Sequence, residues 1–480
     1  MQKFHSIFTL SGVYLPTANL SMRIRNMYYK VILFTSLFIF NAYAATSYTV
    51  MAPLLVEDRD TFRLQLAEAK AIGVDSVSVD VWWGLVEAKA DQAFNWGYYD
   101  SIFADITQAG LKVVPIMSFH QCGGNIGDDC DIPIPGWIWQ HYQDKGLTEQ
   151  DLQYKSEYGN YSVETVSLWA DTYVVSEYKE FIQAFSEHFA HLTDFIAEVN
   201  ISMGAAGELR YPSYNTHDGK LAGYPTRGSF QAYSSLAVKD FQQTMQAKYG
   251  EISKLNSSWH TTYTSFDQLK PPFDGNEFIA IGSYRRTAYG RDFIEWYHQS
   301  LMAHGRRMLD AAHDGLNSSF DSIPVGYKVP GIHWKIGTND ITARSAELAA
   351  GLIHSDWPYS ESNGYGYNNI VALAKHLEGQ NRHVVLHFTA LEMDDNPTHP
   401  SYSYAKTLVG WLGGEAKKQG VEIKGENALA QGVWHARGWQ NIEEALTNHH
   451  YSGLTILRIT EVTVDTLGRK KLENIIKTIE

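Results

Sequence analysis

The sequence predicts an α/β protein, a (β/α)₈ or TIM barrel with long loops after its strands. From Tyr48 onward, eight short apolar segments alternate with amphipathic helical patterns. Several segments are rich in Val and Ile with little alternation, which is typical of parallel strands buried on both faces. An open doubly wound sheet is the alternative, but no glycine-rich phosphate loop follows the first strand. The predicted strands are Tyr48–Ala52, Val74–Val79, Lys112–Met117, Phe195–Ser202, Val325–Val329, Val384–Thr389, Val421–Gly425 and Leu454–Leu457.

The segments between the strands carry apolar residues at helical spacing. Asp60 is positioned to cap a helix in which Phe62 and Leu66 share one face, and Asp292–Ala312 is a second, longer helix. Aromatic side chains repeat at the same spacing, and we interpret them as core packing. No linker, repeat or low-complexity tract divides residues 45–480, which predicts a single domain.

Composition excludes several classes of function. The 480 residues include 39 Lys and Arg against 53 Asp and Glu, a net charge of −14, which argues against a nucleic-acid partner. Cys122 and Cys130 are the two cysteines, too few for a zinc ribbon or a disulfide scaffold. The 19 histidines are scattered and no His-Glu-x-x-His motif occurs, so a metal-dependent hydrolase is disfavoured.

The amino terminus has the pattern of a secretory signal. A basic stretch, residues 23–30, precedes an apolar run at residues 31–40, and residues 42–44 have the small-x-small form of a cleavage site. A membrane anchor is the alternative, but the run is short for about 30 Å of hydrocarbon. We therefore expect residues 1–44 to be a cleaved signal peptide, with Met22 as a second candidate start, and the mature protein to be soluble and secreted, either extracellular or periplasmic.

Polar residues gather where the predicted strands end. In a barrel these ends meet at one rim, so seven strands that each present a polar group favour one shared site. Asp80 closes the second strand, while Glu208 and Glu426 sit beside glycine after the fourth and seventh. A lone acidic residue at a strand end more commonly forms a cap or a salt bridge. Two carboxylates facing a sugar ring can instead hydrolyse a glycosidic bond, one protonated as the acid and the other ionised as base or nucleophile.

Four longer motifs surround the polar residues at the strand ends. They are Val79–Gly84, His120–Asn125, Ala206–Tyr214 and Gly425–Leu429. In these motifs the chain resembles the β-amylases of glycoside hydrolase family 14, and the bacterial members most of all. The resemblance extends from about Met51 to Arg458. It implies a (β/α)₈ enzyme that acts from the non-reducing ends of α-1,4-glucans such as starch, glycogen and maltodextrins, and releases β-maltose with inversion.

The resemblance also implies individual roles. Glu208 matches the general acid, and Glu426 matches the general base that activates water. Residues 120–128 match a mobile lid, and Thr389 matches an inner-loop threonine that plant-like members follow with Cys, where this chain has Ala390. The chain ends soon after the eighth strand, so a catalytic domain at residues 45–480 with no starch-binding module is expected. The implied substrate-binding residues are Asp80, His120, Asp128, Lys328, His333, Thr389, Asn427, Ala428 and Arg458.

The two cysteines bracket the lid. Export makes oxidation available to Cys122 and Cys130, so we expect a disulfide across the base of the loop. Two separate buried thiols are the alternative.

A structural calcium ion is expected past the second strand. Acidic residues cluster there, and some of the bacterial β-amylases that the chain resembles bind calcium through matching positions. Ca²⁺ prefers six to eight oxygen ligands. The alternative is a solvated acidic surface. The implied ligands are Glu87, Asp91, Gln92, Glu177 and Glu180.

We therefore expect a secreted, monomeric glycosidase that needs no cofactor for its chemistry. Its expected partner is the α-1,4-glucan substrate, with no nucleic acid and, after signal cleavage, no membrane. The alternative is a catalytically silent glucan-binding protein on the same barrel, which the presence of both glutamates disfavours. Release of reducing sugar from soluble starch separates the two.

Overall fold

The computed structural model describes residues 46–124, 128–334, 344–464 and 466–479. The predicted signal peptide, residues 1–44, lies outside the described residues. Residues Ala44–Glu480 form one compact unit. Within the described ranges, no helix is both long and apolar enough to span a membrane.

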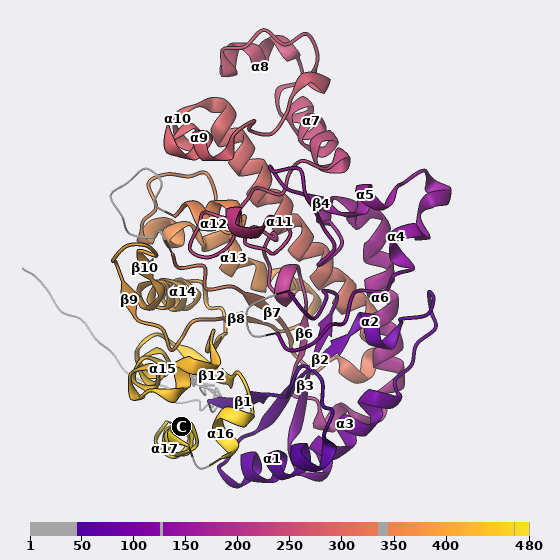
Figure 1. Ribbon diagram of the computed structural model, residues 1–480, viewed down its shortest axis with the longest axis vertical. Helices are drawn as coiled ribbons and strands as arrows, with labels where there is room; N and C mark the ends of the chain where they lie inside the picture. Colours follow the sequence, from indigo (N-terminus) through magenta and orange to yellow (C-terminus); the bar gives the residue numbers. More distant parts are fainter. Residues whose placement is uncertain (1–45, 125–127, 335–343, 465, 480) are drawn as a thin grey trace, which may run out of the picture. The chain divides into compact units, whose positions relative to one another are not determined.

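Eight parallel strands close into a barrel (Figure 1), which confirms the predicted (β/α)₈ fold. Around the barrel the strands follow the order β1-β12-β11-β8-β7-β6-β3-β2, so each strand pairs with its predecessor and its successor among the eight. All eight predicted strands are found. They are β1 Ser47–Met51, β2 Ser76–Trp82, β3 Lys112–Ser118, β6 Val199–Ile201, β7 Val325–Val329, β8 Val384–Phe388, β11 Ile423–Glu426 and β12 Tyr451–Ile456.

Two strand boundaries differ from the prediction in ways that matter for the site. The second strand runs past Asp80 to Trp82, because all seven of its residues pair with β3. Asp80 therefore lies inside the strand rather than at its end. The fourth strand is only Val199–Ile201, because a 3₁₀ segment, Ala190–Phe195, occupies the start of the predicted range.

Helices follow the strands and surround the barrel (Figure 1). The first helix is capped by Asp58 rather than by Asp60, because Asp60 already lies in its first turn. The Asp58 carboxylate accepts hydrogen bonds from the backbone N–H of Asp60 and of Thr61, each at 3.1 Å. The long helix predicted at Asp292–Ala312 is confirmed as part of α11. The main barrel helices are α1 Arg59–Ala71, α3 Gly97–Gln108, α6 Asp171–His188, α11 Ala288–Gly315, α13 Asn368–Ala372, α14 Ala405–Gln419, α15 Ala436–Asn448 and α17 Leu467–Thr478.

Two long insertions interrupt the alternation. One joins β3 to α6 and includes a small hairpin of two strands. The other joins β6 to α11, and Figure 1 shows its helices at the top, furthest from α1 and α3. The remaining short elements are α2 Trp83–Val86, α4 Ile138–His141, α5 Glu149–Leu152, β4 Tyr154–Lys155, β5 Tyr161–Ser162, α7 Ser235–Tyr249, α8 Ile252–Trp259, α9 Gly275–Ala280, α10 Ser283–Arg286, α12 Ser345–Ala349, β9 Asp395–Asn396, β10 Ser403–Tyr404 and α16 Thr460–Thr463.

The barrel strands are buried on both faces, as predicted. Most of them carry polar side chains on the inner face, whereas β3 places Val114 and Ile116 there. In β2, Val77, Val79 and Val81 are buried in the main hydrophobic core. Ser76 and Ser78 alternate with them and line a cavity inside the barrel. Successive side chains of a strand point to opposite faces, so the two environments follow from the period of two. The predicted aromatic stripes are confirmed as core packing, because the side chains of Phe181, Phe185 and Phe189 are fully buried.

Candidate active site

Glu208 reaches the barrel rim through a tight turn after β6. The 3₁₀ turn Ala205–Gly207 redirects the chain, and the backbone N–H of Leu209 then donates to the carbonyl of Lys328 in β7 at 2.8 Å. A Cβ atom at Gly204 would lie 2.5 Å from the Arg210 carbonyl oxygen and 2.7 Å from that of Glu208. Only glycine allows this close approach, which anchors the Glu208 carboxyl beside β7.

Glu208 is nearly buried and has a cationic neighbour. Nε of the fully buried Arg210 donates to Oε2 of Glu208 at 2.9 Å, and the guanidinium stacks 4.0 Å from the Tyr214 ring centre. Burial raises the pKa of Glu208 above its ordinary value, and this outweighs the opposite effect of the Arg210 and Lys328 cations. This carboxyl is therefore suited to hold a proton and donate it.

Glu426 ends β11 and forms an ion pair with Lys328. Nζ of Lys328 lies 2.8 Å from Oε2 of Glu426 and 3.0 Å from Oε1. The pairing register between β11 and β12 shifts just before Glu426, between Ile423 and Gly425. Such an irregularity can re-aim a side chain at the rim of a barrel. The ammonium group stabilises a charged carboxylate at this position.

Lys328 joins three of the predicted site residues. Burial alone would lower the pKa of Lys328, but Glu426, Asp80 and Glu208 raise it. Oδ1 of Asp80 also accepts a hydrogen bond from the Ser118 hydroxyl at 2.8 Å, which holds its carboxylate at the inner face of β2. The two predicted catalytic glutamates and Asp80 therefore share one cation at the centre of the rim.

His120 lies at the same rim and is neutral. Burial, together with Lys328 and Arg210, lowers its pKa to about 3. Its Nδ1 lies 2.9 Å from the Ser202 hydroxyl, and its ring meets Trp82 edge to face at 5.2 Å. A neutral imidazole fixed in this way can hydrogen-bond a sugar hydroxyl without adding charge.

His333 and Thr389 occupy the loops after β7 and β8. Nδ1 of His333 lies 2.6 Å from the Ser403 hydroxyl, and burial lowers the pKa of His333 to about 4. The Thr389 hydroxyl accepts a hydrogen bond from the Gly331 N–H at 2.7 Å, which ties the two loops together. Ala390 follows with φ of +76°, an unusual backbone conformation for alanine and one that clusters at functional sites.

Asn427 and Ala428 sit in a hydrogen-bonded turn after Glu426. The fully buried Asn427 side chain bonds to the backbone of Leu457 through both its oxygen and its nitrogen, at 2.9 and 3.1 Å. The backbone N–H of Ala428 donates to Oε2 of Glu392 at 2.9 Å. Arg458, after β12, donates to the Ala52 carbonyl at 3.2 Å. These contacts place the turn beside the β12 and β1 ends of the rim.

Asp128 lies in the predicted lid, whose central residues 125–127 lie outside the described residues. The backbone N–H of Gly123 donates to Oδ2 of Asp128 at 3.1 Å. Cys122 and Cys130 are bonded through their sulfurs across the base of this loop, with their Cα atoms 5.7 Å apart. That separation suits a disulfide.

The comparisons with known proteins show the family of the chain. The family model described as glycosyl hydrolase family 14 matches residues 49–480. The chain belongs to glycosyl hydrolase family 14. It is 40% identical over 416 residues to a β-amylase of Niallia circulans, covering 86% of this chain and 67% of that protein. A β-amylase of Cytobacillus firmus is 39% identical, over 86% of this chain and 82% of its own length.

A solved structure from the same family has a similar fold. The catalytic domain of a β-amylase from Paenibacillus polymyxa is 36% identical, with a TM-score of 0.79, and the match covers 91% of this chain and 100% of that one. The predicted resemblance to bacterial β-amylases is therefore confirmed. As a member of family 14, the chain is a glycoside hydrolase of the β-amylase type.

Two residues of this family 14 site had no role in the sequence interpretation. Arg210 lies within a recognised motif, but only the structure shows that it contacts Glu208. Glu392, which is almost fully buried, accepts hydrogen bonds from the backbone N–H of Ala428 and Leu429. Burial raises its pKa to about 7, although these two donors act in the opposite direction. The available signal was a glutamate in the same loop as Thr389, after β8.

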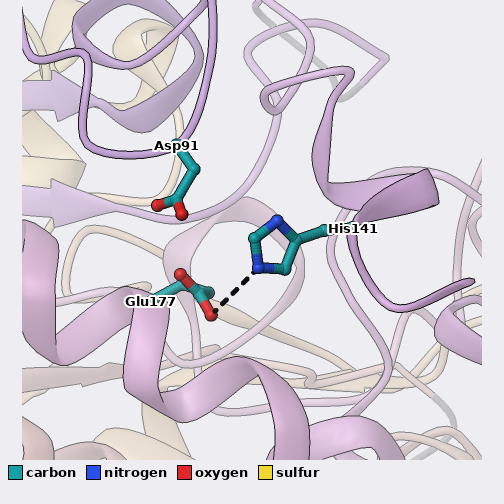
Figure 2. Close-up of side chains that lie close together, drawn as sticks. All are labelled: Asp91, His141 and Glu177. Carbon is teal, nitrogen blue, oxygen red and sulfur yellow. Dashed lines mark ion pairs between the residues drawn. The ribbon is translucent and has the colours of Figure 1, made fainter. Parts of the chain in front are cut away.

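The predicted metal ligands gather beyond the barrel wall, near α2, α4 and α6. One side-chain atom each from Asp91, His141 and Glu177 lies within 4.8 Å of the others (Figure 2). The Tyr142 hydroxyl donates to Oε1 of Glu177 at 2.6 Å, and Nε2 of His141 lies 3.8 Å from the same oxygen. Sequence reasoning missed His141, which reaches the group from a separate helix.

The other predicted ligands are joined to each other. Oε2 of Glu87 accepts from Trp83 Nε1 at 2.6 Å, and its Oε1 accepts from the backbone N–H of Gln92. The Gln92 side-chain nitrogen donates to Glu180 at 2.9 Å. Burial raises the pKa of Glu87 to about 7, and the charges of Asp91 and Glu177 act in the same direction. Carboxylates this close together repel one another unless a proton or a cation is bound.

Proposed function

We propose that this family 14 hydrolase is an exo-acting, inverting enzyme that releases β-maltose from the non-reducing ends of α-1,4-glucans such as starch. The observation that carries the proposal is the contrast between two carboxyls at one rim. Burial raises the pKa of Glu208 and so favours its protonated form, whereas Glu426 is ion-paired with Lys328. One neutral acid and one carboxylate are the pair that glycoside hydrolysis requires.

In this mechanism Glu208 protonates the leaving glycosidic oxygen. Glu426 takes a proton from a water molecule, whose oxygen attacks the anomeric carbon from the opposite face of the sugar ring. The carboxyl groups of an inverting enzyme are about 6.5–9.5 Å apart, which leaves room for that water. The Asp80 carboxylate and the neutral His120 and His333 side chains supply hydrogen bonds to sugar hydroxyls. Tyr224, half exposed beside His333, offers an aromatic surface to a glucose ring.

Two isosteric variants and one product test the proposal. Glu208→Gln removes the proton donor, and Glu426→Gln removes the base, so each should lower kcat on soluble starch by about two to four orders of magnitude. Both should still bind maltose, because the other contacts remain. Proton NMR of the parent reaction should show β-maltose as the first product. Substantial hydrolysis by either variant, or an initial α-anomer, would contradict the assignment.

The proposal includes export. A cleaved signal at residues 1–44 would place the enzyme with external glucan and with an oxidising compartment for Cys122 and Cys130. Amino-terminal sequencing of the protein recovered from the culture medium should begin near Ala45. Recovery of the enzyme only inside the cell, with its leader intact, would contradict this part of the proposal.

We also propose that the acidic group near α2, α4 and α6 holds a structural Ca²⁺. Asp91, Glu177, Glu87, Glu180 and Gln92 supply oxygen atoms, which suits this ion. The nitrogen of His141 is the ligand type that zinc accepts more readily, so the test must separate the two metals. The ion would tie the loop after β2 to α6 and would take no part in the chemistry.

Chelation followed by addition of one metal at a time tests this site. Because an ion that binds only the folded state stabilises it by mass action, EDTA should lower Tm by several degrees and Ca²⁺ should restore it. Asp91→Asn should abolish the response to Ca²⁺, whereas Asp314→Asn, at an exposed acidic residue elsewhere, should not. Restoration by Zn²⁺ alone would assign a different metal, and an unchanged Tm would remove the site.

A further inference from the structure

The inside of the barrel holds a cavity of about 70 Å³, lined by charged, hydroxyl-bearing and apolar side chains. In most barrels of this class, branched apolar side chains fill this space. Here the apolar part of the lining is Val114, Ile116 and Ala197, and hydroxyl-bearing side chains such as Thr49, Ser78 and Thr455 face the same space. A single buried water needs roughly 10–15 Å³ and two to four polar partners, so the cavity can hold several waters.

Charged groups cross the middle of this cavity. Oε1 of Glu198 lies 2.5 Å from Nε2 of His387, and its Oε2 accepts from Nζ of Lys424 at 2.8 Å. Burial alone would raise the pKa of Glu198, but His387 and Lys424 outweigh it and lower the pKa to about 2. The pair of contacts joins β8 and β11 to the start of β6, so ion-paired side chains cross an interior that is apolar only along Val114, Ile116 and Ala197.

The backbone is adapted to this polar interior. A Cβ atom at Gly326 of β7 would lie 1.8 Å from Oδ1 of Asn200 and 2.3 Å from Oε1 of Glu198. Only glycine leaves room for those two side chains. Oδ1 of Asn200 is itself buried, lines the cavity and accepts no hydrogen bond from any residue that the structure describes. A water in the cavity is a donor that this acceptor can use.

The cavity extends from one end of the barrel towards the catalytic base. Asp75, which is exposed ahead of β2, lies at its amino-terminal end. Glu426 and Lys328, which end β11 and lie in β7, line its other end. Glu426 therefore borders two spaces, the rim where substrate enters and the polar interior behind it.

We propose that the polar interior of the barrel is a rear path for water and protons that serves Glu426. This inference rests on the proposed function, in which the carboxylate of Glu426 takes a proton from the attacking water in every turnover. The O–H bond of that water breaks, its oxygen bonds the anomeric carbon, and the proton stays on Glu426. Before the next turnover the proton must leave and a new water must enter.

A glucan that fills the front of the site blocks that side. Through the interior, the proton passes from Glu426 to the cavity waters and reaches bulk solvent near Asp75, while a water moves in the other direction. Glu208 regains its own proton from solvent at the rim. For each bond hydrolysed, one proton leaves the base and one proton returns to the acid, so the number of protons on the enzyme is unchanged.

Isosteric Thr→Val substitutions test the path without touching substrate. Thr49→Val/Thr455→Val replaces two cavity hydroxyls by methyl groups and should lower steady-state kcat by about tenfold, because resetting the base becomes the slow step. That step follows bond cleavage, so KM should fall in parallel and kcat/KM should stay near the parent value. The single variant Thr455→Val should change kcat in the same direction, and it serves if the double variant does not fold. Thr463→Val is the matched control, a buried threonine in α16 that does not line the cavity.

Single-turnover kinetics separate this role from a structural one. With enzyme in excess over maltotetraose, Glu426 acts once from its ionised state, so bond cleavage should proceed at the parent rate in the variants. A steady-state kcat equal to that of the parent, or a single-turnover rate that falls in parallel with kcat, would overturn the proposal. If Glu426 is not the base, Glu426→Gln should keep full activity. That variant therefore separates failure of the proposed function from failure of the proposed water and proton path.

Discussion

Arg210 is expected to set the alkaline limit of activity, because it is the cation that contacts Glu208, the proposed general acid. Its Nε lies 2.9 Å from Oε2 of Glu208, and both groups are buried. At an effective dielectric constant of about 20, two unit charges at this distance interact by about 6 kcal/mol before desolvation is counted. The net value of a hydrogen bond to a charged group is about 1.5–3 kcal/mol.

Arg210→Met removes that stabilisation from the ionised form of Glu208 only. The acid then stays protonated to higher pH, so the basic limb of kcat/KM against pH should move upward. At 1.36 kcal/mol for each pH unit, the net hydrogen-bond energy corresponds to about one to two pH units. The acidic limb, which reports the base, should move less.

The assay is initial maltose release from soluble starch across the pH range, with folding checked by circular dichroism at each pH. Arg210→Lys keeps the charge and should leave the limb near its parent position. Arg227→Met is the matched control, since Arg227 is another buried arginine in an ion pair, 2.9 Å from Glu157. A basic limb that stays in place or moves downward in folded Arg210→Met would refute the reasoning.

One further variant and one chemical treatment test the surroundings of the site. Burial raises the pKa of Glu392 from an ordinary 4.5 to about 7 in the folded protein. Between these two pH values the folded protein binds more protons than the unfolded chain. Its free energy of unfolding therefore falls by about 3 kcal/mol as the pH rises through this range. Glu392→Gln should remove this loss of stability. Urea unfolding below and above that pH range would measure it, and a variant with the same pH dependence as the parent would contradict the prediction. Reduction of Cys122–Cys130 opens a loop with a sequence separation of 8, so the chain-entropy model predicts a loss of about 2–3 kcal/mol. Calorimetry with and without reductant should show the lower Tm, and an identical Tm would contradict the prediction.

The barrel and its two glutamates could be predicted from the sequence because the topology of parallel strands is restrictive. Once eight alternating units are recognised, the strand ends must meet at one rim, and polar residues such as Glu208 and Glu426 fall there together. The partners of those residues could not be predicted in the same way. Which cation contacts which carboxylate depends on side-chain geometry. Only the structure therefore shows that Arg210 contacts Glu208 and that Lys328 contacts Glu426.

The polar interior could have been predicted and was not. Residues 76–81 alternate strictly between polar residues and valine, which is the signal for a strand with two different faces. The high valine content by itself indicates only the apolar face of the strand. His141 is a different case, because it comes from a short helix far along the chain, and no local pattern associates it with Asp91.

The catalytic rim and the cavity below it depend on the same strand register. In β7, Gly326 and Lys328 share the inner face, and in β11 Lys424 and Glu426 do the same, so each strand places one residue in the cavity wall and the next in the active site. A slip of one residue would turn all four outward and bring residues such as Tyr327 and Ile423 inward, burying charges without partners. The ion pairs inside the barrel therefore help to fix the register that aims Glu426 at substrate, which explains why a costly polar interior lies directly below the chemistry.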